Sequence, residues 1–402
     1  MRMMFMTAGS RGDVDPFIAL ARRAQSAGHE VRVAVTGDFV GHVQAAGLDV
    51  AGLDGDYSAL VGAQGASAWA AMRSFRTVIR PMMAGFLRSA ADAALSYRPD
   101  VLVHHPKVLS APLAAARLGI PHVLVEIVPT ITPTRQFPAA GVTGRDLGRL
   151  NPLTYRFVAG AGAMFAGPLR EIRADLGLPV RGEVPGPALT LVPVSPTLLP
   201  RPGDWPGTTQ ITGAWLEPVG AGSAVLDADL DAFLGSGEVV YAGFGSMALG
   251  DASARGAAVA AAVRASGRRL LAVTGWGGLR VPPDLVGEDV LVREAVPHAE
   301  VLERCVAAVH HGGAGTVHAA VRAGVVSVCV PFLADQPFWG ALLHRRGFSA
   351  APVPVRRLTA ARLGTALGTL PDPAAVRAAA RAMAAEDGCG TALAALEQRV
   401  GR

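Results

Sequence analysis

The sequence is poor in several residue types, and each shortage narrows what the protein can be. Only 3 of its 402 residues are cysteine, and Cys305, Cys329 and Cys389 lie far apart, so neither a disulfide framework nor a zinc knuckle is expected. Charged residues make up 17% and aromatic residues 5%. Half of the residues are apolar, which is enough for buried cores and excludes a disordered chain.

Blocks of like charge are missing, although the formal net charge is +5. Arginines are spread along the chain with acidic residues between them, and aromatic side chains that could stack on bases are scarce. Lysine is almost absent beside many arginines, which we interpret as a composition bias of the genome. We therefore expect an arginine-rich solvated surface and no nucleic acid partner.

Long apolar runs and metal-ligand motifs are missing too. No run approaches the length of a membrane-spanning helix, and the apolar start of the chain is too brief for a secretory signal. The ten histidines do not form an HExxH or similar set, so zinc is not expected. The sequence predicts a cytoplasmic protein without integral membrane association, and a monomer or a homodimer.

What is present is an alternation of strand-like and helix-like segments. A strand at 3–7, a polar glycine-containing loop at 8–16, a helix at 17–27 and a strand at 31–35 predict a first βαβ unit. Further strands are expected at 101–104 and 122–128, with a helix at 111–118 between them. This half predicts a parallel sheet wrapped in helices.

Proline and glycine become frequent between residues 185 and 222, and the strand pattern then restarts. The later strands are expected at 239–244, 270–274, 290–292, 307–310 and 326–331. The sequence predicts an α/β protein with two doubly wound, Rossmann-like domains that face a central cleft. The predicted boundaries are 1–205 for the first domain, 206–222 for a linker, 223–385 for the second domain and 386–402 for a C-terminal helix that could return to the first.

Residues 310–316 carry the clearest binding motif. A buried strand runs into His311, a group of glycines and Thr316, and a helix is expected at 317–323. Glycines let a backbone approach a phosphate, and a helix start directs N–H groups and a positive dipole toward it. The alternative is an ordinary strand-to-helix turn capped by Thr316. The histidine pair before the glycines favours a diphosphate site.

Asp335 and Gln336 follow the next predicted strand. An adjacent carboxylate and amide at the carboxyl end of a strand can bind vicinal sugar hydroxyls. The alternative is that Asp335 caps a helix with Pro337 in its first turn. The position of the pair shortly after the phosphate motif favours sugar binding.

From His311 to Gln336 the sequence resembles the nucleotide-sugar signature of the family-1 glycosyltransferases, which have the two-domain GT-B fold. Residues 9–16, GSRGDVDP, look like the N-terminal loop of the glycopeptide-antibiotic and sterol 3β-glucosyltransferase branch. Segments similar to the sterol branch lie at 105–107, 111–112, 132–138, 275–279 and 331–340. The resemblance extends over nearly the whole chain. It implies a first domain that binds the acceptor and a second that binds the nucleotide sugar.

The resemblance also implies a role for each matching residue. Asp13 stands where that branch has its catalytic base, and other branches have a histidine there. The implied donor contacts are Ser10, Arg11, Gly12, Ser246, Val296, His298, His311, Gly313, Gly315, Thr316, Asp335 and Gln336. Of these, Val296 and His298 belong to the loop that holds the nucleotide base through its backbone. The acceptor candidates are His105, Lys107 and Phe332.

The chain departs from the family in its N-terminal half. Plant members support a histidine base with a downstream aspartate, whereas the comparable region here is His104-His105. A carboxylate base needs no such partner, so we expect Asp13 to act alone, with His105 as the next candidate. Taken by itself, Asp13 could instead cap a helix that begins near Pro16. The stretch 57–75 matches little, so it does not indicate an acceptor.

The predicted activity is transfer of a hexose from a nucleotide diphosphate sugar, with UDP-glucose favoured, to a hydroxyl of a hydrophobic small molecule or natural product. One base opposite the leaving group implies direct displacement and inversion. Helix starts and His311 would neutralise the diphosphate, so neither a metal nor another cofactor is expected. Asp227 and Asp229 have the spacing of a metal-binding pair, but we expect them on the solvent face of a helix.

Three other functions stay open at the level of the sequence. One is transfer of a dTDP-deoxysugar in antibiotic biosynthesis, which differs from the first prediction only in the donor. A second is epimerisation of a nucleotide sugar, which would need acid and base groups around the sugar and no acceptor cleft. The third is a non-catalytic helper protein, which would have no need of Asp13, His311 and Asp335 together.

Overall fold

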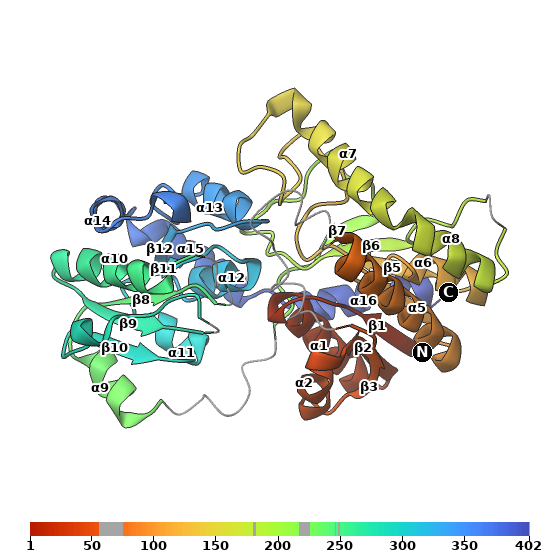
Figure 1. Ribbon diagram of the computed structural model, residues 1–402, viewed down its shortest axis with the longest axis horizontal. Helices are drawn as coiled ribbons and strands as arrows, with labels where there is room; N and C mark the ends of the chain where they lie inside the picture. The colour runs from red at the N-terminus through yellow and green to blue at the C-terminus, as the bar shows by residue number, and fades with distance from the viewer. Residues whose placement is uncertain are drawn as a thin grey trace.

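The computed structural model describes residues 1–55, 75–179, 182–216, 226–245, 247, 250–275 and 277–401. Two parallel sheets, each covered by helices, form its two halves (Figure 1). The seven-stranded sheet has the order β3-β2-β1-β4-β5-β6-β7 and the five-stranded sheet the order β10-β9-β8-β11-β12. The predicted α/β architecture of two doubly wound sheets is confirmed.

The strands of the first sheet are β1 (Arg2–Met6), β2 (Glu30–Thr36), β3 (Asp49–Leu53), β4 (Val101–His104), β5 (His122–Val125), β6 (Leu189–Val192) and β7 (Thr209–Ile211). Those of the second are β8 (Val239–Gly243), β9 (Arg269–Val273), β10 (Val290–Arg293), β11 (Ala307–His310) and β12 (Val326–Cys329). The central strands β1, β4, β8 and β11 are apolar and almost wholly buried, as expected for parallel strands covered on both faces.

The helices of the first half are α1 (Arg11–Ser26), α2 (Val40–Ala45), α5 (Arg80–Tyr97), α6 (Ala111–Leu118), α7 (Asn151–Gly162) and α8 (Ala166–Asp175). Those that follow are α9 (Ala228–Gly235), α10 (Ala252–Ala265), α11 (His298–Leu302), α12 (Ala314–Arg322), α13 (Gln336–Arg345), α14 (Ala360–Gly368), α15 (Pro373–Ala384) and α16 (Gly388–Val400). None of the described helices is both long and apolar enough to cross a bilayer.

Two helices begin earlier than the sequence predicts, and both starts lie in motifs of interest. Residues 11–16, expected in a loop, form the first turns of α1, because Ser10 and Asp13 make a reciprocal capping box. Helix α12 begins at Ala314 rather than 317, with Gly313 as its N-cap. Thr316 is therefore inside the helix, and the alternative that it caps the helix is wrong.

The last helix lies with the first sheet. Leu393 and Leu396 of α16 are buried in one cluster with Phe17 of α1 and Trp215. Figure 1 shows α16 beside these elements, and both ends of the chain in this half of the molecule. Where the chain passes between the halves, Gly213 and Gly388 touch: a Cβ on Gly213 would lie 3.1 Å from the Cα of Gly388.

The predicted domain boundaries stay a prediction. β7 is an edge strand of the first sheet and lies inside the predicted linker at 206–222. Residues 217–222 of that linker are outside the described residues.

We predict that Leu396→Ala lowers the free energy of unfolding by about 2–5 kcal/mol, because it leaves a cavity where α16 packs on the first half. The exposed Gln398 on the same helix is the matched control, and Gln398→Ala should change stability by less than about 0.5 kcal/mol. Urea unfolding of the three proteins measures this. Equal midpoints for Leu396→Ala and wild type would mean that α16 does not contribute to the core.

Candidate active site

In each sheet the chain order reverses at one point. β1 lies beside β4 in the first sheet, and β8 lies beside β11 in the second. The loops after two such strands leave on opposite faces of the sheet, and the crevice between them is where doubly wound proteins bind ligands. Asp13 and His105 follow β1 and β4, while Gly245 and His311 follow β8 and β11. These four residues thus lie at the two switch points, whereas Asp335 follows β12 and His298 follows β10.

Asp13 lies at the centre of a hydrogen-bonded cluster in the first half. Its Oδ2 accepts from the Ser10 N–H (2.8 Å), the Ser10 hydroxyl (3.1 Å) and the ammonium of Lys107 (3.0 Å). Its Oδ1 faces the Nε2 of His105 at 3.3 Å. The expectation that Asp13 acts without a partner is therefore wrong. Ser10 is the N-cap of α1 and Asp13 is its third residue, so the alternative that Asp13 caps a helix beginning near Pro16 is wrong.

The cluster fixes the proton on His105. The backbone N–H of Lys107 donates to His105 Nδ1 (3.1 Å), so the ring proton is on Nε2 and points at Asp13. Burial lowers the pKa of His105, against the opposing effect of Asp13, and keeps the ring neutral. Both ring nitrogens of His105 are thus engaged, one by the Lys107 backbone and the other by Asp13.

The charge state of Asp13 is also fixed. Burial alone would raise its pKa, but the charge of Lys107 and the hydrogen bond from His105 outweigh burial and hold the pKa well below its usual value. The carboxylate is therefore ionised throughout the neutral range. His104, which precedes His105 in the sequence, points away from Asp13, and its Nε2 contacts His122 (3.0 Å).

In the second half, the start of α12 is open to a ligand. Within the part of the chain that the structure describes, no side chain caps this helix, and a Cβ on Gly315 would meet nothing within 4 Å. The N–H groups of Gly315 and Thr316 in the first turn lack intrahelical partners by geometry. Such a helix start attracts anions.

His311 lies between the two glycine turns of the second half. A Cβ on Gly313 would overlap its Nε2, and one on Gly245 would lie 3.5 Å from its Cε1. Burial lowers the pKa of His311 to about 4, so the ring is neutral. Its Nδ1 is buried, and a hydrogen bond with the Gly243 backbone opposes the effect of burial on the pKa of the ring. Its Nε2 is the ring nitrogen next to Gly313, the N-cap of α12, and is the candidate ligand atom.

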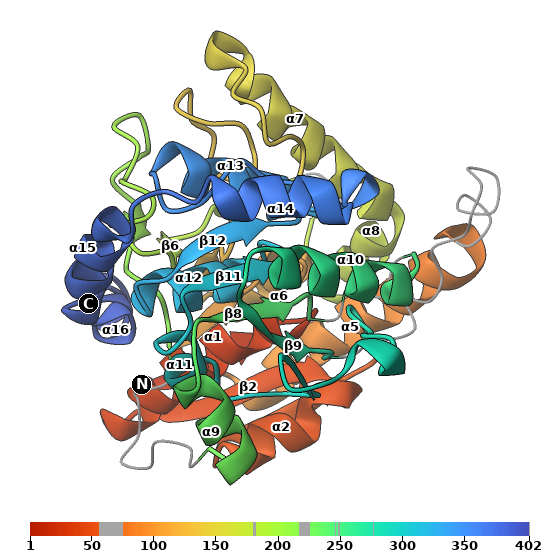
Figure 2. The same cartoon turned by 90° about the vertical axis from the view of Figure 1, so that its left-hand side faces the viewer.

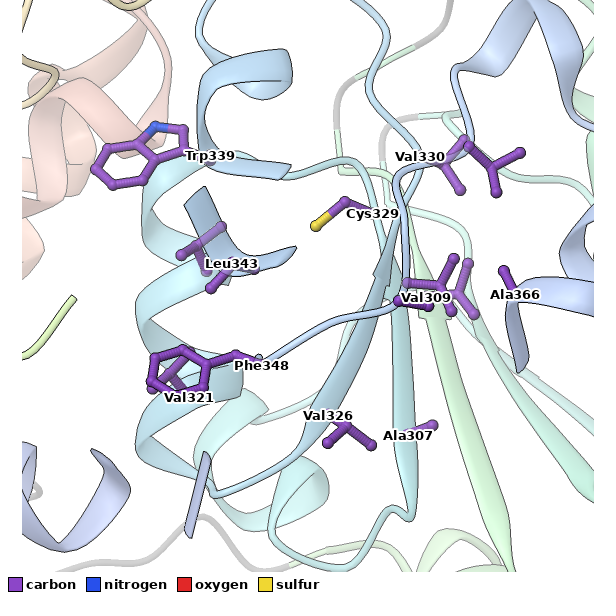
Figure 3. Packing of buried hydrophobic residues seen from close by; sticks show 14 of the residues in the cluster. Ala307, Val309, Val321, Val326, Cys329, Val330, Trp339, Leu343, Phe348 and Ala366 are labelled. Atoms are coloured by element: carbon purple, nitrogen blue, oxygen red, sulfur yellow. The ribbon is translucent and has the colours of Figure 1, made fainter. Parts of the chain in front are cut away.

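Asp335 is held in place by Trp339. The indole N–H of Trp339 donates to Asp335 Oδ2 at 2.7 Å, and the Asp335 side chain does not cap α13. Figure 3 shows Trp339 and Leu343 of α13 on the side of the sheet toward which Cys329 of β12 points. Ala334 has a left-handed φ of 56°, an uncommon conformation for a residue with a Cβ.

The two halves meet at this turn. Burial raises the pKa of Asp335, and the hydrogen bond from Trp339 lowers it. The charge of Asp13 raises this pKa further, and the charge of Lys107 lowers it. Asp13 of the first half thus acts electrostatically on Asp335 of the second. Residues 141–144 of the first half cover the turn, since a Cβ on Gly141 would lie 3.8 Å from the Ala334 carbonyl carbon.

Other predicted donor residues have structural partners already. Gln336 is buried, and its side-chain oxygen accepts from the N–H groups of Phe332 (2.8 Å) and Leu333 (3.2 Å). His298 contacts the Tyr241 hydroxyl through Nε2 (2.9 Å), and Val296 is buried beside it. Their roles in donor binding stay predictions.

The remaining predicted residues lie in three different places: at the start of α1, against Phe244, or outside the described residues. Ser10 is the N-cap of α1, while Arg11 and Gly12 are exposed in its first turn. Phe332, an acceptor candidate, packs against Phe244, with ring centroids 5.5 Å apart. Ser246, together with the stretch 57–74 and Trp276, lies outside the described residues.

The aspartate pair with metal-binding spacing has another role. Asp227 is the N-cap of α9 and accepts from the Leu230 N–H (2.9 Å). Arg293 donates to the same carboxylate at 2.9 Å and lies 3.9 Å from Asp229. Within the described residues, no group of three or more His, Cys, Asp or Glu side chains could hold a metal ion.

Glu126 is a residue that the sequence reasoning missed. It follows β5, is fully buried, and accepts from the N–H groups of Thr130, Ile131 and Thr132 at 2.8–3.1 Å and from the Thr132 hydroxyl. Burial raises its pKa, against these hydrogen bonds. Glu126 anchors the segment that leads to the cover over Ala334. Its position at the carboxyl end of a buried strand was the available signal.

Two family models match the chain. The glycosyltransferase family 28 N-terminal domain matches residues 3–128, and the erythromycin biosynthesis protein CIII-like C-terminal domain matches residues 282–394. The first match includes Asp13, His105 and Lys107. The second includes His311 and Asp335.

Relatives match over almost the whole chain. O-mycaminosyltylonolide 6-deoxyallosyltransferase of Streptomyces fradiae is 32% identical, and the match covers 99% of this chain and 97% of that protein. Sterol 3-beta-glucosyltransferase UGT80A2 of Arabidopsis thaliana is 29% identical over 98% of this chain. The chain spans 64% of that plant protein's own length.

Solved structures share the fold. The glycotransferase of kitacinnamycin superposes with a TM-score of 0.75 at 22% identity, covering 99% of both chains. Glycosyltransferase SsfS6 of Streptomyces sp. SF2575, complexed with thymidine diphosphate, has a TM-score of 0.63 at 21% identity, again covering 99% of both. The predicted GT-B fold is confirmed. The chain belongs to the family-1 GT-B glycosyltransferases, in the branch that contains the sterol 3-beta-glucosyltransferases and antibiotic glycosyltransferases, and is itself a glycosyltransferase.

Proposed function

We propose that the protein moves a hexose, with inversion and without a metal, from a nucleotide diphosphate sugar to a hydroxyl of a hydrophobic small molecule. The observation that carries this proposal is the ionised carboxylate of Asp13, which is held by Ser10, His105 and Lys107 and acts electrostatically on Asp335 in the other half of the molecule. A base on one half and a sugar ligand on the other are what a transfer across a cleft requires.

Asp13 has the properties of an acceptor base. It is ionised, it is held by Ser10 and His105, and its side chain is still 18% exposed to solvent. Oδ1 receives only the His105 contact, whereas Oδ2 receives three donors, so Oδ1 is the atom with room for an acceptor hydroxyl. A single base that acts from the face opposite the leaving group gives inversion.

The second half supplies the leaving-group site. The open start of α12 and the Nε2 of His311, which lies next to Gly313, offer a positive dipole and a ring nitrogen to a diphosphate. Neutral His311 acts as a hydrogen-bond donor when its proton is on the nitrogen that faces the ligand. These groups can stabilise the developing charge without a bound cation, and the Asp227 carboxylate is engaged by α9 and Arg293.

We favour UDP-glucose as donor, since sterol 3-beta-glucosyltransferases match the chain along its length. A dTDP-deoxysugar is the second candidate. It is supported by the deoxyallosyltransferase, which has nearly the same extent as this chain, and by the thymidine diphosphate bound to SsfS6. A hydrophobic acceptor, a sterol or an antibiotic aglycone, is supported by the exposed side chains of Ile131 and Val142 on the segment that covers Ala334.

A panel of UDP- and dTDP-sugars, each incubated with sterols and macrolide or aromatic aglycones, tests the proposal. Mass spectrometry should detect a glycosylated acceptor, and NMR of the product should show an anomeric configuration opposite to that of the donor. An epimerised donor without transfer would favour the epimerase alternative. Thermal stabilisation by a donor without any turnover would favour the helper protein.

We expect Asp13→Asn to lower turnover by about 10²–10⁴-fold, the usual range for loss of a general base. Asparagine can still accept the Ser10 N–H, and the half-exposed Lys107 can be solvated, so melting should change little. Turnover, donor titration and a melting curve of both proteins measure this. Near wild-type turnover would remove Asp13 as the base.

Trp339→Phe should keep the packing of α13 and remove the hydrogen bond to Asp335. Loss of one hydrogen bond to a charged group corresponds to roughly tenfold or more in kcat/KM for the nucleotide sugar. Affinity for the nucleoside diphosphate, which lacks the sugar, should stay unchanged. An equal loss for the sugar nucleotide and the diphosphate would show that Asp335 does not act on the sugar.

Activity should persist in excess EDTA, because helix starts and His311 take the place of a metal at the diphosphate. The measurement is initial rate with and without chelator, and a Mg²⁺-saturated EDTA sample controls for ionic strength. Activity that disappears and returns with Mg²⁺ or Mn²⁺ would contradict the prediction.

A further inference from the structure

Lys107 is the only lysine in the sequence, in a chain that otherwise uses arginine for its permanent positive charges. It follows β4, and its ammonium lies 3.0 Å from Asp13 Oδ2. The Lys107 side chain is 41% exposed, whereas that of Asp13 is 18% exposed. The Lys107 side chain is therefore partly open to solvent, while the carboxylate is mostly covered.

The ammonium lies where three parts of the site meet. A Cβ on Gly9 would be 2.5 Å from Lys107 Nζ, so the ammonium lies directly against the turn that leads into α1. Gly9 has a φ of 140°, which favours glycine, and the close approach of the ammonium leaves no room for a side chain at this position. Lys107 also acts electrostatically on Asp335 in the other half. The ammonium thus contacts Asp13 and the turn before α1, and acts electrostatically on the turn that carries Asp335.

Asp13 does not need Lys107 to stay in position. Its Oδ2 keeps the N–H and the hydroxyl of Ser10, and its Oδ1 keeps His105, when the ammonium leaves. Only the charge balance changes. A carboxylate that is paired with a cation is a weaker base than one that is not.

An anionic ligand in the crevice competes for the same ammonium. A nucleoside diphosphate carries more negative charge than one carboxylate, and lysine is a point charge on a flexible stem that can turn from one anion to another. Arginine, with its planar guanidinium, is less suited to such an exchange. This difference gives a reason for a lysine at this one position.

We propose that Lys107 is a positioning residue that pairs with Asp13 while the donor site is empty and pairs with the diphosphate once the donor is bound. The exchange strengthens Asp13 as a base only when a sugar is in place to react. No covalent bond changes in this step. The inference rests on the proposed function, because it requires a diphosphate in the crevice.

Because Lys107 is the only lysine, an amine reagent reports on one side chain apart from the chain's N-terminus. We expect thymidine diphosphate or uridine diphosphate, whichever the protein binds, to slow reductive methylation of Lys107 by formaldehyde at least several-fold. The matching nucleoside at saturating concentration should not slow it. Equal protection by the nucleoside would mean that the ligand merely covers Lys107 and would overturn the proposal.

Lys107→Met provides the second measurement. Its affinity for the same nucleoside diphosphate should fall by about tenfold or more, the effect of losing one charged contact, while nucleoside affinity stays unchanged. In kinetics, donor KM should rise and kcat should stay within about threefold. The control is Arg117→Met, which removes one positive charge from the exposed end of α6 in the same half.

The measurements distinguish a failure of the Lys107 exchange from a failure of the proposed glycosyl transfer. Unchanged diphosphate affinity in Lys107→Met, or a fall in kcat without a rise in KM, would show that Lys107 stays with Asp13 and would overturn the exchange. Both results leave wild-type transfer intact. If wild-type protein binds neither nucleoside diphosphate, the proposed function itself fails.

Discussion

The buried carboxylate of Asp13 is the interaction on which both the local fold and the site depend. It closes the capping box that starts α1 at Arg11, and it is the anion that Lys107 and His105 surround. A carboxylate buried without partners would be costly, and here every partner has a second function. Ser10 begins the helix, His105 is fixed by the Lys107 backbone, and Lys107 faces the crevice. Asp13 can therefore serve both as part of the capping box of α1 and as the base proposed for it.

The second half depends on the first through the start of α12. The N–H of Ser195, just after β6, donates to His318 Nε2 at 3.2 Å, and His318 Nδ1 donates to the carbonyl of Ala314 at 2.7 Å. Ala314 is the first residue of α12, so a single buried histidine connects the first half to the helix whose start is open to an anion. Ser195 and Thr197 also donate to Glu386, in the segment where the chain returns to the first half. In Figure 2, α12 lies among the elements of the second half, with α15 and α16 following toward the first.

Local patterns in the sequence predicted many of the strands and helices described above. Strand β4, strand β11 and helix α6 were predicted at their observed bounds, because alternation of apolar strands and glycine-closed helices is a short-range signal. The glycines around His311 and the aspartate at 335 were likewise identified within their own motifs. Two kinds of feature were missed: the contact of Lys107 with Asp13, 94 positions away, and the turn that directs the N–H groups of residues 130–132 to Glu126. No periodicity encodes such contacts.

The start of α1 shows why a motif can be recognised and still be placed in the wrong structure. The segment GSRGDVDP has glycines and a proline, which are typical of a loop, and Pro16 does lie inside the observed helix. The capping box outweighs these residues, because it satisfies two N–H groups at the helix start that would otherwise lack partners. The same geometry holds the Asp13 side chain beside the Ser10 backbone, at the edge of the sheet where β1 ends and β4 brings in His105 and Lys107. The base role proposed for Asp13 requires such a fixed carboxylate, because a base must be held in place to act on a hydroxyl delivered by diffusion. The helix start is therefore part of the proposed site rather than only its support.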